Sequence, residues 1–480
     1  MSEGIEKELK LELPADEPRL DLSALDAAAE GGTLSLVSTY YDTPGNDLKK
    51  AGFSLRVRKS NGRHVQTVKA QRGPVSGLFV RPEWEQDIAG TRPVLSRAGP
   101  LAEAVGAEAL RHLGRAFVTE IERKVHKVRL GGATILIADD CGEVRAGRHV
   151  EQVREVELEL ERGDPRAIFA LAKRLGDHVP LRLGVRSKSE RGYLLREKRG
   201  KAVKAEPIDL APDDSTASAF ETIAHACIRQ YRLNETSLMA KGTPEPLHQA
   251  RVGLRRLRSA FSVFGPMFAE DGKAQLLRAE LRWLAAALGD VRDLDVLIPR
   301  LPETEGKVVT ERRVAAFDRA LAEVDSARTR ILMLDLSEWL AFGDWRTVPA
   351  DPALSGQDIA VTARAILKAR RKTLKRRGRH LIDLPDAERH ELRKQAKKLR
   401  YATEFFAALY PGSADYQAFL EQLQAFQDDL GELNDLATIP ELLGRLGLDA
   451  GAVVAETDRA ELVERAHRGY RNLVELKRFW

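Results

Sequence analysis

Charged side chains alternate with apolar ones in a segment near the start of the chain, IEKELKLEL (5–13). Glu6, Glu8 and Lys10 fall on one side at two-residue spacing, and leucines fall on the other. This alternation predicts a β-strand with two acids and a base on a single face. A strand read alone would usually turn such a face toward solvent, as half-buried antiparallel sheets do.

Other segments of the first 200 residues carry charge of one sign at the same spacing. One segment carries only bases at this spacing, Arg56 and Arg58, and another carries only acids, Glu155, Glu157 and Glu159. Neighbouring carboxylates repel one another, and hard divalent ions such as Mg²⁺ or Mn²⁺ relieve that repulsion through oxygen ligands. Arginine and lysine faces would hold the oxygens of a multiply charged anion. If the sheet closes into a barrel, both sets share one lumen, which suits a metal–polyphosphate complex.

The elements that must position these residues are mostly strands in the first 200 residues. Strand composition or alternation marks segments 33–43, 53–59, 64–70, 78–88, 121–130, 133–140 and 154–160. Two helices are expected between them, at 21–30 after Asp21 and at 164–179, which opens with Asp-Pro. Turn signals such as SNGR and LGGA separate strands.

The period of the apolar residues changes in the second half. Residues 197–214 are polar with two prolines and read as a linker, and long helical patterns follow from residue 215. A chain of 480 residues is too long for one core. We therefore expect an α+β protein with domains at 1–200 and 215–480, joined by a linker at 201–214.

The helical half repeats itself. The segment 248–264 resembles 390–406, and the segment 281–297 resembles 423–439 at the same offset along the chain. A constant offset across separate segments indicates a duplicated helical unit, with repeats at about 215–345 and 357–480. The duplication also pairs Gly289 and Asp293 with Gly431 and Asp435, and we expect both aspartates to hold nearby arginines by hydrogen bonds.

Charge and composition limit the partners. The net charge is +5, yet residues 359–382 contain nine Lys or Arg and no acid, which favours a polyanionic partner. No window approaches the ~20 apolar residues of a membrane helix, and no apolar signal-peptide core is present. The two cysteines, Cys141 and Cys227, lack metal-ligand spacing. We therefore expect a cytoplasmic protein without a membrane partner.

The first half resembles the CYTH domain, the triphosphate tunnel metalloenzyme family, and most closely its inorganic triphosphatase branch. After the Glu6-x-Glu8-x-Lys10 opening, further matches come in the family's order. They are YYDTP (40–44), LRVR (55–58), TVK (67–69), GLFVRPEWE (77–85), Arg123, ADDCGEV (138–144), EVELEL (155–160) and RSKSERGY (186–193). The resemblance implies a closed, antiparallel eight-stranded β-barrel with flanking helices, and metal-dependent hydrolysis of inorganic triphosphate with Mg²⁺ or Mn²⁺.

The resemblance also implies a role for each charged residue. The phosphate ligands would be Lys10, Arg56, Arg58, Lys69, Arg81, Arg123 and Lys188. Four of these phosphate ligands would be catalytic: Lys10, Arg56, Arg58 and Lys188. The metal ligands would be Glu6, Glu8, Asp140, Glu155, Glu157 and Glu159. Glu83 and Glu85 are either ligands or partners of nearby arginines. No Ser–His–Asp or Cys–His arrangement is evident, so a covalent intermediate is not favoured.

The second half resembles the CHAD domain, a helical module that implies two helical bundles related by duplication and a basic surface for inorganic polyphosphate. The residues that match its repeated motif are His248, Arg251, Arg255, Arg256 and Arg258, then His390, Arg393, Lys397, Lys398, Arg400 and Tyr401. Spacings of three and four place each set on one helix face. A single such face is usually a solvated surface, but its duplication favours an anion-binding site.

Three other functions stay open. Class IV adenylyl cyclases and thiamine triphosphatases of the same superfamily need the same charged lumen. A non-enzymatic protein that binds polyphosphate or associates with its granules would also use both halves, although it would not need so many lumen carboxylates. Nucleic acid could bind nonspecifically at residues 364–379, but the sequence shows no readout motif, so this partner is not favoured.

Overall fold

The chain forms two compact units in the computed structural model. The residues that the structure describes are 2–23, 25, 27–29, 32–70, 75–95, 99–196, 202–241, 243–449 and 458–480. The first unit comprises Met1–Lys201 together with Asp325–Gly343, and the second comprises Ala202–Val324 and Asp344–Trp480. A short segment of the C-terminal half is therefore part of the first unit.

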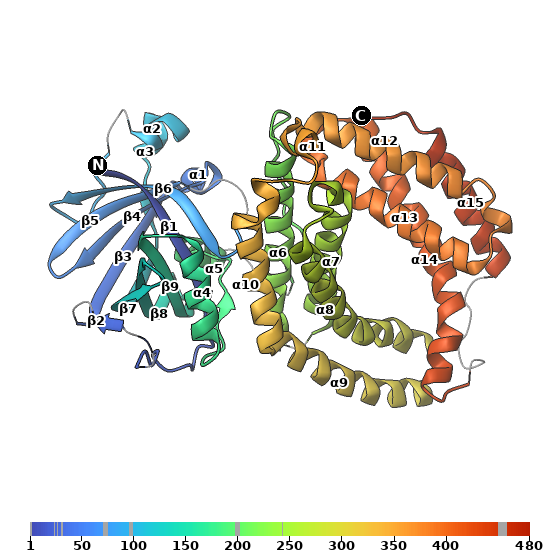
Figure 1. Cartoon of the computed structure of the whole chain (residues 1–480), viewed down its shortest axis with the longest axis horizontal. Helices are drawn as coiled ribbons and strands as arrows, with labels where there is room; N and C mark the ends of the chain where they lie inside the picture. The colour runs from blue at the N-terminus through green and yellow to red at the C-terminus, as the bar shows by residue number, and fades with distance from the viewer. Residues whose placement is uncertain are drawn as a thin grey trace. The chain divides into compact units, whose positions relative to one another are not determined.

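An antiparallel barrel dominates the first unit (Figure 1). Its eight strands pair in the order β1, β6, β5, β4, β3, β7, β8, β9, and β1 pairs again with β9 to close the barrel. Their bounds are β1 Ser2–Glu12, β3 Leu34–Asp42, β4 Phe53–Ser60, β5 Arg63–Ala70, β6 Leu78–Ile88, β7 Gly114–Leu130, β8 Ala133–Ala146 and β9 His149–Arg162. Two short strands, β2 (Ala27–Ala29) and β10 (Arg182–Leu183), pair with β7 and β1. The predicted closed barrel is confirmed.

Every strand predicted from alternation is present, and three of them are longer than expected by four residues or more. β7, β8 and β9 extend beyond the segments 121–130, 133–140 and 154–160 at one or both ends. The helix expected at 21–30 is wrong, because Ala27–Ala29 form a strand that pairs with Lys127 and its neighbours on β7. Alanine favours helix in isolation, and pairing to an existing sheet edge outweighs that preference here. Residues 24, 26 and 30 lie outside the described residues.

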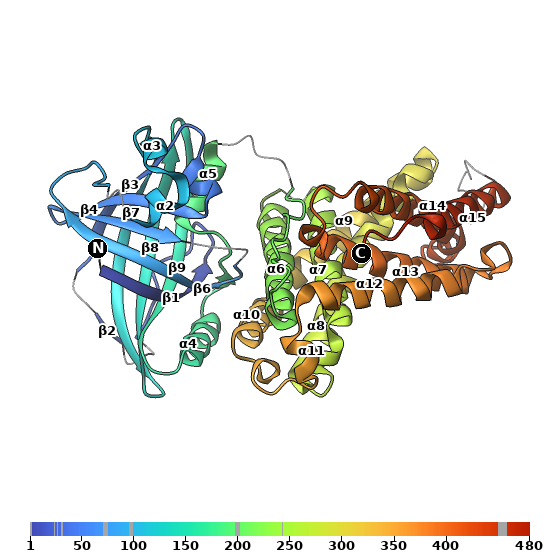
Figure 2. The same cartoon turned by 90° about the horizontal axis from the view of Figure 1, so that it is seen from above.

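Short helices cover the outside of the barrel (Figure 2). Apolar side chains of β3, β4 and β5 pack against three of them, α1 (Asp47–Lys50), α2 (Pro100–Val105) and α3 (Ala107–Leu110). In contrast, α5 (Lys188–Arg196) faces the interior, where its Tyr193 joins a second apolar cluster with Tyr40 and Phe117. A Cβ at Gly192 would lie 2.2 Å from the Phe117 ring, so α5 approaches the sheet where only glycine fits. The predicted helix at 164–179 is present as α4 (Arg166–Gly176).

One helix of the first unit comes from the second half of the sequence. α10 (Ala327–Phe342) packs against α4 and β10. Phe342 meets Phe169 of α4 edge to face, with ring centroids 6.0 Å apart. Lys173 of α4 pairs with Asp335 at 2.6 Å. Both an apolar contact and a charged contact therefore fix α10 on the barrel unit.

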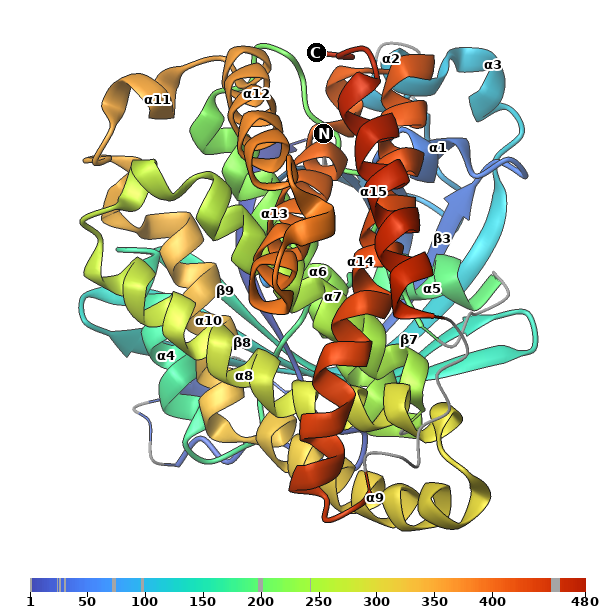
Figure 3. The same cartoon turned by 90° about the vertical axis from the view of Figure 1, so that its right-hand side faces the viewer.

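The second unit is helical and duplicated (Figure 3). Its helices are α6 (Thr216–Lys241), α7 (Pro244–Val263), α8 (Gly272–Leu297), α9 (Glu303–Asp325), α11 (Pro352–Gly356), α12 (Ile359–Arg377), α13 (Asp386–Phe405), α14 (Ala414–Arg445) and α15 (Arg459–Glu475). When the offset of the sequence repeat is applied, α13 coincides with α7 at both ends, and α14 begins where α8 begins. The offset read from the sequence is therefore the offset of the folded elements.

The two repeats meet at their first residues. A β-bridge joins Ser215 to Asp358, and the amide of Ile359 donates to the carbonyl of Asp214 at 2.8 Å. The buried hydroxyls of Thr216 and Thr362 lie 2.7 Å apart. Among the described residues, no helix has both the length and the apolar character that crossing a membrane requires.

Candidate functional site

The interior of the barrel is a charged cavity of about 220 Å³. Charged residues from β1, β4, β5, β6, β7, β9 and α5 line it because alternate residues of each strand point inward. They are Glu6, Glu8, Lys10, Arg56, Arg58, Lys69, Arg81, Glu83, Glu85, Arg123, Glu157, Glu159 and Lys188. Eleven of the thirteen barrel residues predicted to bind phosphate or metal are in this set. The other two, Asp140 and Glu155, lie directly behind Lys188.

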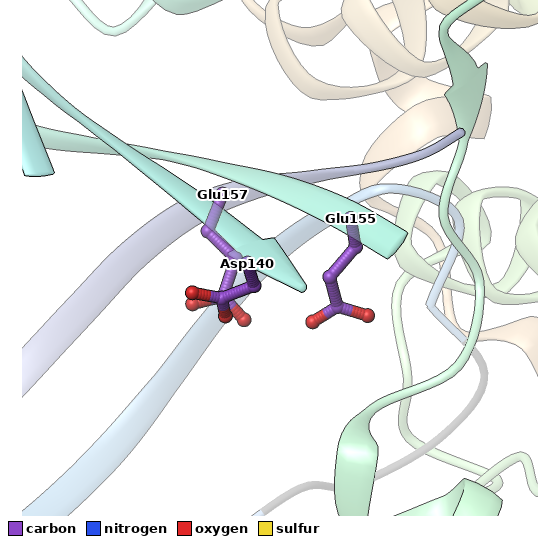
Figure 4. A group of neighbouring side chains, drawn as sticks. All are labelled: Asp140, Glu155 and Glu157. Atoms are coloured by element: carbon purple, nitrogen blue, oxygen red, sulfur yellow. The ribbon is translucent and has the colours of Figure 1, made fainter. Parts of the chain in front are cut away.

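Three buried carboxylates gather at one side of the cavity. Asp140 of β8 and Glu155 and Glu157 of β9 project to the same side of the sheet (Figure 4), and each offers an oxygen within 4.8 Å of the others. Lys188 contacts all three, at 2.7 Å from Asp140 and 3.0 Å from Glu157. Burial opposes ionisation of Glu157, but Lys10, Lys188 and Arg123 lower its pKa well below the usual range. Glu157 is therefore anionic at neutral pH.

A second group of charges surrounds the opening acids of β1. Glu6 accepts from Lys69 at 2.6 Å and from Arg81 at 3.0 Å. Although burial raises the pKa of a carboxyl, Lys69 and Arg81 lower the pKa of Glu6 to about 2. Glu8 accepts from Arg81 at 2.7 Å and pairs with Lys10 at 3.2 Å. Lys10 also pairs with an acid of β9, so this group and the carboxylate cluster form one network of ion pairs.

The wall formed by β4 carries two cations that acids offset only weakly. Arg58 donates to the hydroxyl of Ser38 at 3.3 Å and forms no ion pair within the described part of the chain. Arg56 approaches Glu83 only to 3.9 Å, and its buried Nε has no hydrogen-bond partner among the described residues. Burial, together with the neighbouring Arg56, lowers the pKa of Arg58 to about 10. An anion bound beside these two guanidinium groups would relieve their mutual repulsion.

The remaining acids occupy the edge of the cavity. Glu83 contacts Lys69 at 3.2 Å, and Glu85 accepts from the hydroxyl of Thr67 at 2.8 Å. Glu83 is thus a partner of a base, as one of the two sequence interpretations holds. Glu159 is the exposed acid of the group. Its partial burial and the nearby Glu6 and Glu8 raise its pKa to about 7, so it is the acid of this cavity that most readily takes up a proton.

Sequence reasoning missed the uncharged residues that line the cavity: Tyr40, Ser54, Thr67, Ser187 and Ser189. Burial opposes ionisation of Tyr40, but Arg56 and Arg58 lower its pKa, and its hydroxyl hydrogen-bonds Arg56. A signal for Tyr40 was available, since it is the first residue of the YYDTP motif and lies on a predicted strand.

The neighbouring Asp42 has a structural role. It accepts from the hydroxyl of Tyr193 at 2.6 Å and from the backbone amides of Leu48 and Lys49 in α1. These bonds tie α1 and α5 to the end of β3. The acid of the YYDTP motif therefore holds elements of the barrel together and does not line the cavity.

The second unit contains a larger cavity, of about 1410 Å³. Of the ten basic motif residues predicted to bind polyphosphate, seven line it: His248, Arg251, Arg255, Arg256, Arg393, Lys397 and Arg400. The other three, Arg258, His390 and Lys398, are not among the lining residues. The Nδ1 of His390 hydrogen-bonds Asn434, which does line the cavity.

The duplicated motif residues keep matched surroundings in the two repeats. Arg251 donates to the carbonyl of Gly289 at 3.0 Å, and Arg393 lies 3.6 Å from where a Cβ of Gly431 would be. Each arginine therefore lies beside the glycine of its repeat. Among the described residues, neither arginine donates the expected hydrogen bond to the aspartate of its repeat, although the charge of that aspartate acts on it. Asp435 instead pairs with Arg300 at 3.0 Å.

The centre of this cavity concentrates positive charge around Tyr401. Arg255 donates to the Tyr401 hydroxyl, and the guanidinium of Arg400 lies 5.0 Å from the centre of the Tyr401 ring. Lys397 has no ion pair among the described residues. Burial, followed by Arg393 and Arg255, lowers the pKa of Lys397 to about 7. Such a cluster is costly alone and favourable around a polyanion.

Comparisons with known proteins agree with this division. The CYTH domain family matches residues 4–193, and the CHAD domain family matches residues 222–444. An inorganic triphosphatase of Haemophilus influenzae is 30% identical over 176 residues, which are 35% of this chain and 48% of that protein. The chain thus spans about half the length of this curated relative.

Two solved structures are each similar to part of the chain. The CHAD domain from the plant Ricinus communis is 32% identical with a TM-score of 0.46, and the match covers 56% of this chain and 90% of that one. A putative adenylyl cyclase from Hippeastrum, described as having a dominant triphosphatase activity, is 19% identical with a TM-score of 0.29. That match covers 40% of this chain and 95% of the other.

Proposed function

Because residues 4–193 are a CYTH domain and residues 222–444 are a CHAD domain, we propose that this chain hydrolyses inorganic triphosphate inside its barrel and binds polyphosphate in its helical cavity. The observation that carries the first part is the pair Arg56 and Arg58, whose charges are only weakly offset by acids, in one small cavity that also holds buried carboxylates. Bases and acids that line the same cavity fit an anion that is bound together with metal ions.

The carboxylate cluster fits a divalent metal. Asp140, Glu155 and Glu157 supply only oxygen donors, close enough together to share one ion, and this donor set suits Mg²⁺ or Mn²⁺. Glu6, Glu8 and Glu159 complete the proposed ligand set. When bound, the metal would neutralise phosphate oxygens and lower the pKa of a bound water.

The bases of the barrel would hold the substrate. Arg56 and Arg58 bind phosphoryl oxygens as two guanidinium forks, a geometry that suits phosphate. Lys10, Lys69, Arg81, Arg123 and Lys188 neutralise charge that develops as the terminal P–O bond breaks. Most of these bases now pair with carboxylates of the cavity. On binding, phosphate oxygens would replace carboxylates as partners of the bases, and metal ions would replace bases as partners of the carboxylates.

The helical cavity supports polyphosphate binding by the same physics. Arg255, Arg393, Lys397 and Arg400 lie on two helices that face one space, and two of them contact a central tyrosine. Lys397 gains most from an anion, because its ammonium group is now buried among other cations.

A phosphate-release assay with Mg²⁺ or Mn²⁺ tests the enzyme proposal. The substrates are triphosphate, long-chain polyphosphate, ATP and thiamine triphosphate, each measured with and without EDTA. We expect release from triphosphate to be fastest and to stop when EDTA removes the metal. Faster turnover of thiamine triphosphate, or cyclic AMP formation from ATP, would assign the chain to another activity of the superfamily.

A further inference from the structure

The backbone of Lys10 is held at a junction between two strands. Its amide donates to the carbonyl of Gly77 at 2.9 Å, and its carbonyl accepts from the amide of Gly184 at 2.8 Å. Gly77 directly precedes β6, and Gly184 directly follows β10. The position of Lys10 therefore depends on two turns that lie outside its own strand.

The Gly77 turn has little freedom of its own. Gly77 adopts a φ of +87°, and a Cβ there would lie 2.1 Å from Leu183, so only glycine fits. Leu183 is itself paired with β1 next to Lys10. The turn, β10 and Lys10 thus form one packed unit in which a shift of one part moves the others.

Helix α10 reaches this unit from the far half of the sequence. The hydroxyl of Ser337 donates to the carbonyl of Ser76 at 2.7 Å, and both serines are 0% exposed. α10 also packs against β10 and is fixed to α4 by the contacts of Phe342 and of Asp335. Breaking a hydrogen bond between two fully buried groups is costly, so this bond constrains the turn strongly.

We propose that α10 supports the barrel of the first unit and that Ser337 positions Lys10 through the Ser76–Gly77 turn. The expected effect on catalysis rests on the proposed function, whereas the structural role of α10 does not. Ser337 touches neither the cavity nor its charges, so it is a positioning residue. The barrel of this chain would then be incomplete without a helix encoded far beyond its last strand.

Hydrogen exchange in the full-length protein tests this role of α10 without any substrate. In Ser337→Ala we expect the amide of Lys10 to exchange about tenfold faster, because its acceptor turn loses its anchor. Ser337→Thr, which keeps the hydroxyl, should restore slow exchange. The matched control is Ser326→Ala, which removes the N-cap of the same helix, where the Ser326 hydroxyl accepts from the amide of Thr329 at 3.2 Å. Equal exchange at Lys10 in both alanine variants would overturn the proposal.

Kinetics test the consequence for the reaction. We expect Ser337→Ala to lower kcat for triphosphate about tenfold, since small displacements of a positioned group have effects of this size. In a Lys10→Met background the same change should have no further effect, because its route through Lys10 is gone. A full additional loss in that background would overturn the proposal. If the wild type releases no phosphate, the proposed function fails, and the exchange experiment still decides the role of α10.

A cysteine variant keeps the test decisive if Ser337→Ala does not fold. Ser337→Cys preserves size and a weak donor, so exchange at Lys10 and kcat should both fall between the serine and alanine expectations. Wild-type exchange in a soluble Ser337→Cys variant would count against the hydrogen bond as the link.

Discussion

Arg123 binds Asp140 with two parallel hydrogen bonds, from Nε and Nη2, each 2.7 Å long. A third bond from the same guanidinium reaches Glu157 at 2.5 Å. Arg58, by contrast, donates to the hydroxyl of Ser38 and lies beside other cations. The two arginines line one cavity, yet the charge of Arg123 is compensated by acids and that of Arg58 is not.

This contrast predicts opposite effects on stability. Arg58→Met should raise the melting temperature by a few degrees, because it removes a buried charge that has no acidic partner in the described part of the chain. It should also lower triphosphate turnover by about 100-fold, the usual loss for one charge-stabilising donor. The matched variant Arg123→Met should instead lower the melting temperature, because it removes one of the bases that compensate the buried Asp140 and Glu157. Thermal unfolding and phosphate release measured on both variants check the pair; destabilisation by Arg58→Met would contradict it.

Glu8 is the second target. Glu8→Gln should retain the fold but lower Mg²⁺-dependent release from triphosphate by about 100-fold or more, since the amide keeps the shape and loses the charge. Circular dichroism and the melting curve establish the fold, and the release assay gives the activity. Unchanged turnover would remove Glu8 from the site. Glu12 is on the same strand but pairs with Arg191 at 2.7 Å and does not line the cavity, so Glu12→Gln serves as the control.

The helical cavity predicts a split between binding and hydrolysis. Arg255→Glu combined with Lys397→Glu should weaken retention on a polyphosphate matrix by about 100-fold, because two charges change sign at the centre of the cavity. Hydrolysis of short triphosphate should stay near the wild-type rate.

The matched control changes two motif residues that do not line the cavity. Arg258→Glu combined with Lys398→Glu alters the net charge of the chain equally. Equal loss of retention in both double variants would show that overall charge, and not the cavity, governs binding.

Polyphosphate binding should weaken as the pH rises through 7. In the unliganded protein Lys397 has a pKa lowered to about 7, and a bound polyanion would raise it, so binding takes up a proton above pH 7. We expect the affinity for long chains to fall about threefold to tenfold between pH 6.5 and pH 8.5. Lys397→Arg, which stays charged, should flatten this profile. A profile equally steep in that variant would exclude Lys397 as the titrating group.

The same lowered pKa has a consequence for stability. The lysine of the unfolded chain titrates near its ordinary pKa of 10.5, so between pH 7 and about 10 the unfolded state binds the extra proton. The contribution of Lys397 therefore makes the free energy of unfolding rise with pH across this window. Lys397→Met should remove that rise, as urea unfolding at pH 7 and pH 9 would measure.

The sequence predicted much of the barrel site because two-residue alternation determines which side chains share an interior. It placed Glu6, Glu8 and Lys10 together, and the barrel confirms that they line one cavity. It could not predict that Asp140 and Glu155 lie behind Lys188, because that choice depends on where helix α5 meets the closed sheet. Which acid pairs with which base depends on the tertiary structure.

The helical half shows a second limit. The constant offset between the repeats makes Arg258 equivalent to Arg400 and Arg256 equivalent to Lys398. Yet Arg256 and Arg400 line the cavity and their equivalents do not. Arg251, Arg255 and their equivalents line the cavity in both repeats, so the repeats differ only in which further motif residues reach it, and a sequence repeat cannot reveal that difference. The role of α10 in the first unit was hidden for the same reason, since no local pattern says which unit a helix joins.

The location of bound ligands tests the central claim most directly. Crystals of a slow variant such as Glu8→Gln, grown with triphosphate and Mn²⁺, would show the metal by its anomalous scattering. We predict an anomalous peak at the carboxylates of Asp140, Glu155 and Glu157, with phosphate density against Arg56 and Arg58. Triphosphate bound only in the helical cavity, with no metal inside the barrel, would contradict the account.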